Sequence, residues 1–220
     1  MSVLPVTVLV VAKAPVPGLA KTRLAAAVGD QLAAEIAAAA LLDTLDTVAA
    51  TPVAARVVAF TGELAAAASA DDIADRLESF TVITQRGIDF ADRLANAHVD
   101  AAGSSPVLQI GMDTPQVTAD LLARCGHQLE DAAAVLGPAC DGGWWALGLR
   151  TPAAVGCLRT VAMSQPDTGT LTLAALRGQG LDVEILDELA DVDVAEDIPA
   201  VREACAPTSR FAQLTRAAGL

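Results

Sequence analysis

The chain has 220 residues, of which 53% are hydrophobic, and it carries a formal net charge of −13 at pH 7. This length and apolar content suit a single domain with a full hydrophobic core. Most of so acidic a surface would repel a nucleic-acid backbone, so the composition argues against a DNA- or RNA-binding protein.

Cysteine and histidine usage excludes a further class of site. The four cysteines include no C-x-x-C pair and there are only two histidines, so a zinc site built on such ligands is not expected. A chain this apolar does not need disulfides, which indicates reduced core thiols in a cytoplasmic protein. No segment of the sequence reaches the ~18 apolar residues that span a bilayer, so no membrane partner is expected.

Strand-like and helix-like segments alternate along the whole chain. The β-branched run at residues 6–12 predicts a buried first strand, and residues 30–50 predict a long helix. This alternation predicts a mostly parallel sheet with helices on both faces. Further strands are expected at 56–60, 81–84, 107–111, 133–137, 144–149 and 183–186. Further helices are expected at 62–77, 89–102, 117–129, 168–177 and 196–204.

No repeat or linker divides these segments. We expect residues 1–205 to form one domain and residues 206–220 to form a C-terminal helix or tail. In sheets of this kind, ligands bind beyond the carboxyl ends of the strands. Site residues are therefore expected in the loops that directly follow the strands.

The loop after the first strand, AKAPVPGLAKTRLA at residues 12–25, contains the only two lysines of the chain, Lys13 and Lys21, together with Arg23. Its two prolines stiffen the loop, and Gly18 permits a tight turn. Lys21 and Arg23 fall near the start of the long helix, where backbone N–H groups and the helix dipole favour an anion. Lysine and arginine side chains also bind phosphate oxygens. We favour a polyphosphate-binding loop over the alternative, a solvated basic loop.

A carboxylate follows the fourth strand directly, in the motif GMDTP at residues 111–115. Asp113 at such a position would face the ligand crevice, and it suits Mg²⁺, which takes one or two carboxylates and substrate phosphates. The alternative is a helix cap, because Asp113 or Thr114 before Pro115 makes a sound helix start. The two interpretations are compatible if Thr114 caps the helix and Asp113 binds the metal.

Three weaker motifs contain further polar residues. In CDGGWW, residues 141–143 form either a hairpin turn or a ligand-facing loop, and the two tryptophans should point to opposite faces of a strand, one into the core and one into a pocket. In DVDVAED, Asp191 and Asp193 share a face, and by themselves they indicate the acidic first turn of a helix. Asp89 and Arg93 lie one helical turn apart, for which a surface ion pair is the default interpretation.

The ordered segments AKAPVPGLAKTRLA, QIGMDTP, GPACDGGWWALGL and DVDVAED resemble a family of the GT-A (nucleotide-diphospho-sugar transferase) superfamily. Some members of that family are described as glycosyltransferases associated with arsenosugar biosynthesis. AKTRLA and the late DVD also resemble the 2-phospholactate guanylyltransferases and, more distantly, the molybdenum cofactor guanylyltransferases. The resemblance covers most of the chain, from the first strand to about residue 201. Residues 163–166, MSQP, stand where the family has a W-S-T-P-like stretch.

The resemblance implies a three-layer α/β/α fold with a Rossmann-like, mostly parallel sheet, a nucleotide donor in the crevice, and Mg²⁺ or Mn²⁺ as cofactor. The implied metal ligands are Asp113 and Asp193. The implied catalytic residues are Lys21, Arg23, Asp113 and Asp141. The implied nucleotide- and phosphate-binding residues are Ala12, Lys13, Pro17, Gly18, Lys21, Arg23, Asp89 and Arg93. The implied acceptor-side residues are Gly142, Gly143 and Trp144.

Three functions are compatible with these motifs. The first is a metal-dependent glycosyltransferase with a nucleotide sugar as donor and a small molecule as acceptor, which the full motif set favours. The second is a guanylyltransferase-like nucleotidyltransferase that releases pyrophosphate. Residues 21–23, KTR, favour this second function, because a triphosphate needs more positive charge. The third is a nucleotide-binding protein without catalytic activity.

Overall fold

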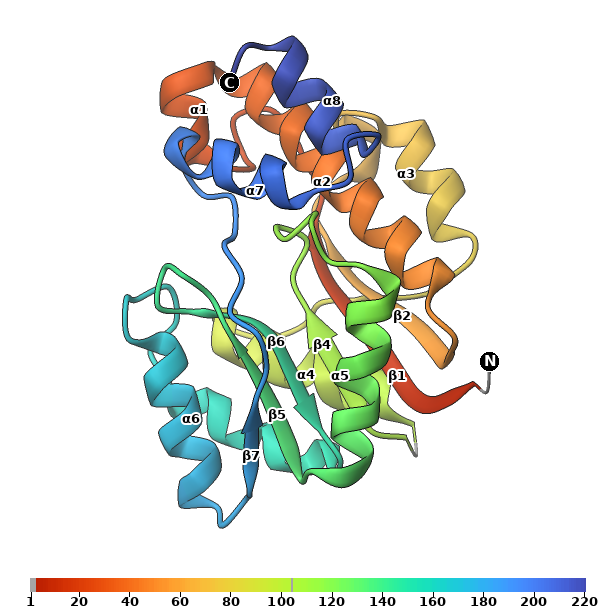
Figure 1. The fold of residues 1–220 in the computed structure, drawn as a ribbon, viewed down its shortest axis with the longest axis vertical. Helices are drawn as coiled ribbons and strands as arrows, with labels where there is room; N and C mark the ends of the chain where they lie inside the picture. Colours follow the sequence, from red (N-terminus) through yellow and green to blue (C-terminus); the bar gives the residue numbers. More distant parts are fainter. Residues whose placement is uncertain (1–2, 104) are drawn as a thin grey trace.

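The described part of the chain folds as one seven-stranded sheet with helices packed on both of its faces (Figure 1). The computed structural model describes residues 3–103 and 105–220. The strand order is β3-β2-β1-β4-β6-β5-β7. The strands are β1 (Leu4–Lys13), β2 (Val53–Thr61), β3 (Thr81–Thr84), β4 (Val107–Ile110), β5 (Ala134–Pro138), β6 (Trp144–Leu149) and β7 (Val183–Ile185).

All paired strands run parallel except β6, which is antiparallel to both β4 and β5. Strand β6 reverses because only residues 139–143 join it to β5, and a parallel return would need a crossover of a dozen or more residues. The remaining strands are separated by helices, which supply those crossovers. The expected three-layer, mostly parallel α/β/α fold is confirmed.

The helices form the two outer layers of the molecule. Helices α2, α3 and α5 cover one face of the sheet, and α4, η2 and α6 cover the other. The α-helices are α1 (Thr22–Val28), α2 (Asp30–Ala50), α3 (Ala70–Leu77), α4 (Phe90–Ala102), α5 (Ala119–Asp131), α6 (Thr168–Gly178), α7 (Ile198–Ala204) and α8 (Arg210–Ala217). The 3-10 helices are η1 (Leu64–Ala66), η2 (Pro152–Thr160) and η3 (Ala195–Asp197).

Strand β1 contributes side chains to the hydrophobic clusters on both faces of the sheet. Its side chains alternate between the two faces of the sheet, as strand geometry requires. Val6, Val8 and Val10 are fully buried under α2 and α5, whereas Leu9 is fully buried in the opposite cluster, beside Ala97 of α4. A β-branched strand that is buried on both faces therefore forms the centre of the molecule.

Two predicted helices are broken in the structure. The long helix is preceded by the separate short helix α1, and Gly29 with φ 86° divides the two. Lys21 and Arg23 therefore lie at the start of α1, which has only seven residues, and not at the start of the long helix. The helix expected over 62–77 is replaced by η1 and α3, which Ala67, Ala68 and Ser69 connect.

The C-terminal segment packs against α1, α2 and α7 (Figure 1). Phe211 of α8 is fully buried. Both carboxylate oxygens of Asp43 on α2 accept hydrogen bonds from backbone N–H groups of α8, from Arg210 at 3.0 Å and from Phe211 at 2.9 Å. These contacts fasten α8 to the long helix. Within the described ranges, no helix is long and apolar enough to cross a membrane.

Candidate active site

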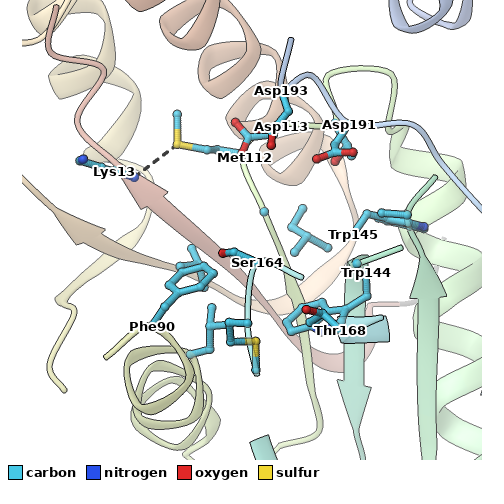
Figure 2. A pocket seen from close by; sticks show the side chains of 18 of the residues that line it. Lys13, Phe90, Met112, Asp113, Trp144, Trp145, Ser164, Thr168, Asp191 and Asp193 are labelled. Carbon is cyan, nitrogen blue, oxygen red and sulfur yellow. Dashed lines mark hydrogen bonds between the residues drawn. The ribbon is translucent and has the colours of Figure 1, made fainter. Parts of the chain in front are cut away.

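A cleft of about 680 Å³ opens at the carboxyl ends of β1, β2 and β4. The order of the strands reverses between β1 and β4, and ligands of open α/β sheets bind at such a switch point. The cleft also receives the start of β6, the connection at 163–166 and the segment at 191–193. In Figure 2, Asp113, Asp191 and Asp193 lie together at one end of the cleft, and Phe90 and Trp144 lie at the other.

The pairing of β1 with β4 sets the two most important loops beside each other. Val10 stands opposite Ile110 in this parallel pair, so Lys13 and Asp113 each follow three residues later at the same level. The backbone N–H of Lys13 donates to the sulfur of Met112 at 3.3 Å (Figure 2). The loop at residues 12–25 and the GMDTP motif therefore form adjoining walls of the cleft.

The ammonium group of Lys21 lies between two carboxylates. Its Nζ is 3.0 Å from Oδ2 of Asp113 and 3.1 Å from Oδ1 of Asp193. The Lys21 side chain is only 10% exposed. Burial disfavours the charged form of Lys21, but the two carboxylates outweigh burial and raise the pKa of its ammonium group above the usual value. Nη1 of Arg23 makes a further ion pair with Oδ2 of Asp193 at 3.1 Å.

The two carboxylates implied as metal ligands are thus brought to one point in space. The Lys21 ammonium shows that this point attracts a cation, and carboxylate oxygens are the ligands that Mg²⁺ and Mn²⁺ prefer. Among residues 3–103 and 105–220, no three His, Cys, Asp or Glu side chains form a group that could hold a metal ion. Asp113 and Asp193 fit a Mg²⁺ or Mn²⁺ ion that takes its remaining ligands from substrate phosphates and water.

A further carboxylate, Asp191, lies next to this pair and also lines the cleft (Figure 2). Burial raises the pKa of the Asp191 carboxyl to about 6, and the neighbouring charges of Asp141 and Asp193 add to this effect. The alternation in DVDVAED indicates a shared face for Asp191 and Asp193, but Asp191 is absent from the site residues derived from the sequence.

The two tryptophans divide between core and cleft, as the alternation in a strand predicts. Trp145 is 3% exposed, packs in the core on the α2 and α5 side, and donates its Nε1–H to the carbonyl of Asp187 at 2.9 Å. Trp144 is half-buried, packs towards the opposite cluster and lines the cleft. This prediction is confirmed.

The expected ion pair between Asp89 and Arg93 does not form. Asp89 is the N-cap of α4, and its Oδ1 accepts the backbone N–H of Asp92 at 2.8 Å, so the carboxylate is held at the helix start. Arg93 instead lines the cleft, with its guanidinium carbon 5.9 Å from the centre of the Phe90 ring. The ion-pair interpretation was wrong because the local cap competes for the same carboxylate.

The residues implied by the resemblance either line a hollow or lie outside both hollows. Those that line the main cleft are Ala12, Lys13, Arg23, Arg93, Asp113, Asp141, Gly143, Trp144 and Asp193, and Lys21 lines a smaller hollow beside it. Those that line neither are Pro17, Gly18, Asp89 and Gly142.

Gly142 acts in packing. It has φ 89°, and a Cβ built on it would lie 1.8 Å from the carbonyl oxygen of Pro166. Its own carbonyl accepts the backbone N–H of Gly169 at 2.8 Å. Gly142 therefore lets the turn before β6 rest directly on the connection at 163–166, which forms part of the cleft wall.

Several cleft residues are not among those derived from the sequence. They include Gln85, whose amide donates to the carbonyls of Ala12 and Ala59, and Gln109, whose carbonyl oxygen lies 3.1 Å from Nδ1 of buried His98. Gln85 follows the predicted strand 81–84 directly, so its position was a usable signal. Gln109 lies within a strand, and only the tertiary structure shows that it borders the cleft.

A protein-family model described as "Uncharacterized protein conserved in bacteria (DUF2064)" matches residues 44–165, more than half of the chain. The chain belongs to this family. For this DUF2064 member, no curated protein gives a significant sequence match.

Solved structures with the same fold are similar to this DUF2064 protein over nearly its whole length. The "putative nucleotide-diphospho-sugar transferase" from Desulfovibrio desulfuricans G20 is 24% identical, with a TM-score of 0.84, over 100% of this chain and 96% of that chain. CMP:2-keto-3-deoxy-manno-octonic acid synthetase in complex with CTP is 12% identical, with a TM-score of 0.55, over 90% and 97%. Rv0371C of Mycobacterium tuberculosis H37Rv in complex with manganese is 16% identical, with a TM-score of 0.53, over 90% and 97%. The resemblance to the GT-A superfamily is confirmed at the level of the fold.

Proposed function

We propose that this DUF2064 protein is a metal-dependent transferase that uses a nucleotide-activated donor, and specifically a glycosyltransferase with a nucleotide sugar as donor. The observation that carries the proposal is that Nζ of Lys21 lies within 3.1 Å of carboxylate oxygens of both Asp113 and Asp193, at the switch point of the sheet. A diphosphate leaving group is stabilised by cationic side chains and by a metal held on carboxylates, and Lys21, Arg23, Asp113 and Asp193 would supply these groups at one place.

The roles of the residues follow from their chemistry. Asp113 and Asp193 would hold Mg²⁺ or Mn²⁺, which when bound supplies positive charge to the donor phosphates. The acceptor oxygen would attack the anomeric carbon, and the bonding electrons would leave with the diphosphate. Lys21 and Arg23 would offset the negative charge that develops on this leaving group.

Asp141 would serve on the acceptor side. Its Oδ1 accepts the backbone N–H of Gly143 at 2.7 Å, which orients the carboxylate at the rim of the cleft. In the described chain no hydrogen bond occupies Oδ2, so this oxygen would accept the hydrogen bond, and then the proton, of an acceptor hydroxyl.

The comparisons support a nucleotide-activated donor, because the similar folds include a protein named for nucleotide-diphospho-sugar transfer and a synthetase that binds CTP. The manganese complex of a third similar fold supports a metal of this class.

A second candidate, nucleotidyl transfer with release of pyrophosphate, is favoured by the number of cationic groups. Lys13, Lys21 and Arg23 all border the same hollow, which would suit the three phosphates of a nucleoside triphosphate.

Titration calorimetry with Mg²⁺ separates these candidates. We expect Mg²⁺-dependent binding of one or more nucleotide sugars, tighter than binding of the matching triphosphate, followed by transfer to an acceptor. Asp113→Asn should abolish the metal-dependent part of the binding, while the control Asp120→Asn, an exposed carboxylate at the start of α5, should leave it unchanged.

Other outcomes of these titrations would favour a different function. A preference for a triphosphate with release of pyrophosphate would establish the second candidate. Nucleotide binding without any turnover would indicate the non-catalytic function. Equal affinity of Asp113→Asn and wild type would refute the assignment of Asp113 as a metal ligand.

A further inference from the structure

Arg93 differs from the nearby cationic residues Lys13, Lys21 and Arg23 because, in the described part of the chain, its side chain has no polar partner. Lys21 and Arg23 are held by carboxylates, and the ammonium group of Lys13 donates to a backbone carbonyl at 2.6 Å. Within residues 3–103 and 105–220, the Arg93 side chain makes no ion pair and no hydrogen bond, and its Nε is buried without a partner. A buried N–H group that lacks a partner is costly, so a position of this kind is suited to a ligand that supplies the acceptor.

The carboxylates on the same helix are occupied elsewhere. Asp89 caps the first turn of α4. Asp92 accepts a hydrogen bond from Nε of Arg159 at 2.9 Å, and the same arginine also donates to Asn96 at 2.7 Å. Arg159 therefore neutralises the acid next to Arg93 in sequence, and Arg93 keeps its charge available to the cleft.

Part of the cleft wall is apolar. The guanidinium group of Arg93 lies over the ring of Phe90, and Leu94, Met163 and Trp144, which belong to one apolar cluster, line the same cleft. Figure 2 shows Phe90 and Trp144 at the end of the cleft away from the clustered carboxylates. An anion near this cation is screened less by water than one at the open surface, which strengthens the attraction.

The two ends of the cleft thus have different chemistry. The end with Lys21, Asp113 and Asp193 suits a metal and the donor phosphates, as proposed above. We propose that the other end is the acceptor subsite, in which Arg93 binds an anionic group of an acidic acceptor while Phe90 and Trp144 contact its apolar part. The planar guanidinium group offers two parallel N–H donors, which match a carboxylate or a phosphate.

This inference rests on the proposed transferase function, and it narrows the acceptor to small molecules with a carboxylate or phosphate beside an apolar segment. It also moves Arg93 from the nucleotide-binding residues, where the family resemblance places it, to the acceptor side. The roles differ in a measurable way, because an acceptor-binding residue can be removed without weakening nucleotide binding.

The test uses three probes of similar size: benzoate, phenyl phosphate and neutral benzyl alcohol. Each is titrated calorimetrically into wild type, Arg93→Gln and Arg177→Gln. Arg177 is an exposed arginine near the end of α6 that lines neither hollow, so its substitution removes the same charge as a matched control. The fluorescence of the only two tryptophans, one of which lines the cleft, gives a second readout.

We expect wild type and Arg177→Gln to bind at least one of the two anions more tightly than benzyl alcohol. Arg93→Gln should weaken anion binding by about tenfold or more, the change that loss of one charge-assisted contact brings. The affinity for nucleotide with Mg²⁺ should stay within about twofold of wild type. The ratio of the benzoate and phenyl phosphate affinities tells which anion the subsite takes.

Three results would overturn the inference: no anion binding by wild type, equal anion binding by Arg93→Gln, or an equal loss of nucleotide binding in that variant. The proposed function fails separately, if wild type binds no nucleotide with Mg²⁺ while anion binding still depends on Arg93.

Discussion

Buried His98 should make the stability of this protein depend on pH between about 6.5 and 4. The side chain of His98 on α4 is fully buried, and its Nδ1 lies 3.1 Å from the Gln109 carbonyl oxygen, towards which it donates in the neutral form. Burial lowers the pKa of His98 to about 4 from its ordinary 6.5, although the Gln109 hydrogen bond opposes the change. We predict that acidification selectively removes the stability that this neutral imidazole contributes.

The sign follows from proton uptake by the unfolded chain. Between pH 6.5 and pH 4 the unfolded histidine takes up a proton and the folded one does not, so the free energy of unfolding falls as the pH falls. The contribution is complete above pH 6.5 and is lost as the pH approaches 4. At about 1.4 kcal/mol per pH unit, the loss between pH 7 and pH 5 is about 2 kcal/mol.

Urea unfolding of wild type and His98→Asn at pH 7, 6 and 5 measures this loss. Asparagine can keep the hydrogen-bond donor to Gln109 but does not titrate. Between pH 7 and pH 5 we therefore expect the free energy of unfolding of His98→Asn to fall by about 2 kcal/mol less than that of wild type. Asp191, whose raised pKa of about 6 stabilises the folded chain as the pH falls, acts in the opposite direction in both proteins and cancels in the difference.

An equal pH dependence of stability in the two proteins would show that His98 does not change its protonation between the folded and unfolded chain in this way. If the variant does not fold, NMR titration of wild type decides instead. There are only two histidines, and the exposed His127 provides the reference signal. A His98 signal that titrates near pH 6.5 would contradict the prediction.

Three further predictions concern the site and the packing around it. Lys21→Met should bind Mn²⁺ alone more tightly than wild type, because no ammonium group competes for the two carboxylates, yet bind nucleotide more weakly; unchanged Mn²⁺ affinity in calorimetry would contradict this. Gly142→Ala should lower the free energy of urea unfolding by about 2 kcal/mol or more, since its Cβ would collide with the Pro166 carbonyl at a φ of 89°; wild-type stability would show that the turn can move. Phe211→Ala should cost about 3–5 kcal/mol in the same assay, and a much smaller loss would mean that α8 is not part of the cooperative core.

Local sequence patterns are enough to locate the strands, most of the helices and the polar loops that border the cleft. The β-branched run of β1, the alternation of strands and helices, and polar loops after the strands are local properties, because strand and helix periodicity depend on neighbouring residues. The positions of Lys13 and Asp113 at the ends of β1 and β4 followed from that pattern. So did the division of the two tryptophans between core and cleft.

Long-range packing sets which of these groups come into contact. Lys21 and Asp193 are 172 residues apart in the sequence, and only the sheet order brings the ammonium group between Asp193 and Asp113. Arg93 likewise makes no ion pair with Asp89, because Asp89 caps the start of α4 while Arg93 lines the cleft, whose walls come from several elements. These contacts depend on how distant segments pack together, and the spacing of residues along the chain does not show that packing. Sequence patterns can therefore indicate candidate site residues without showing which of them are in contact.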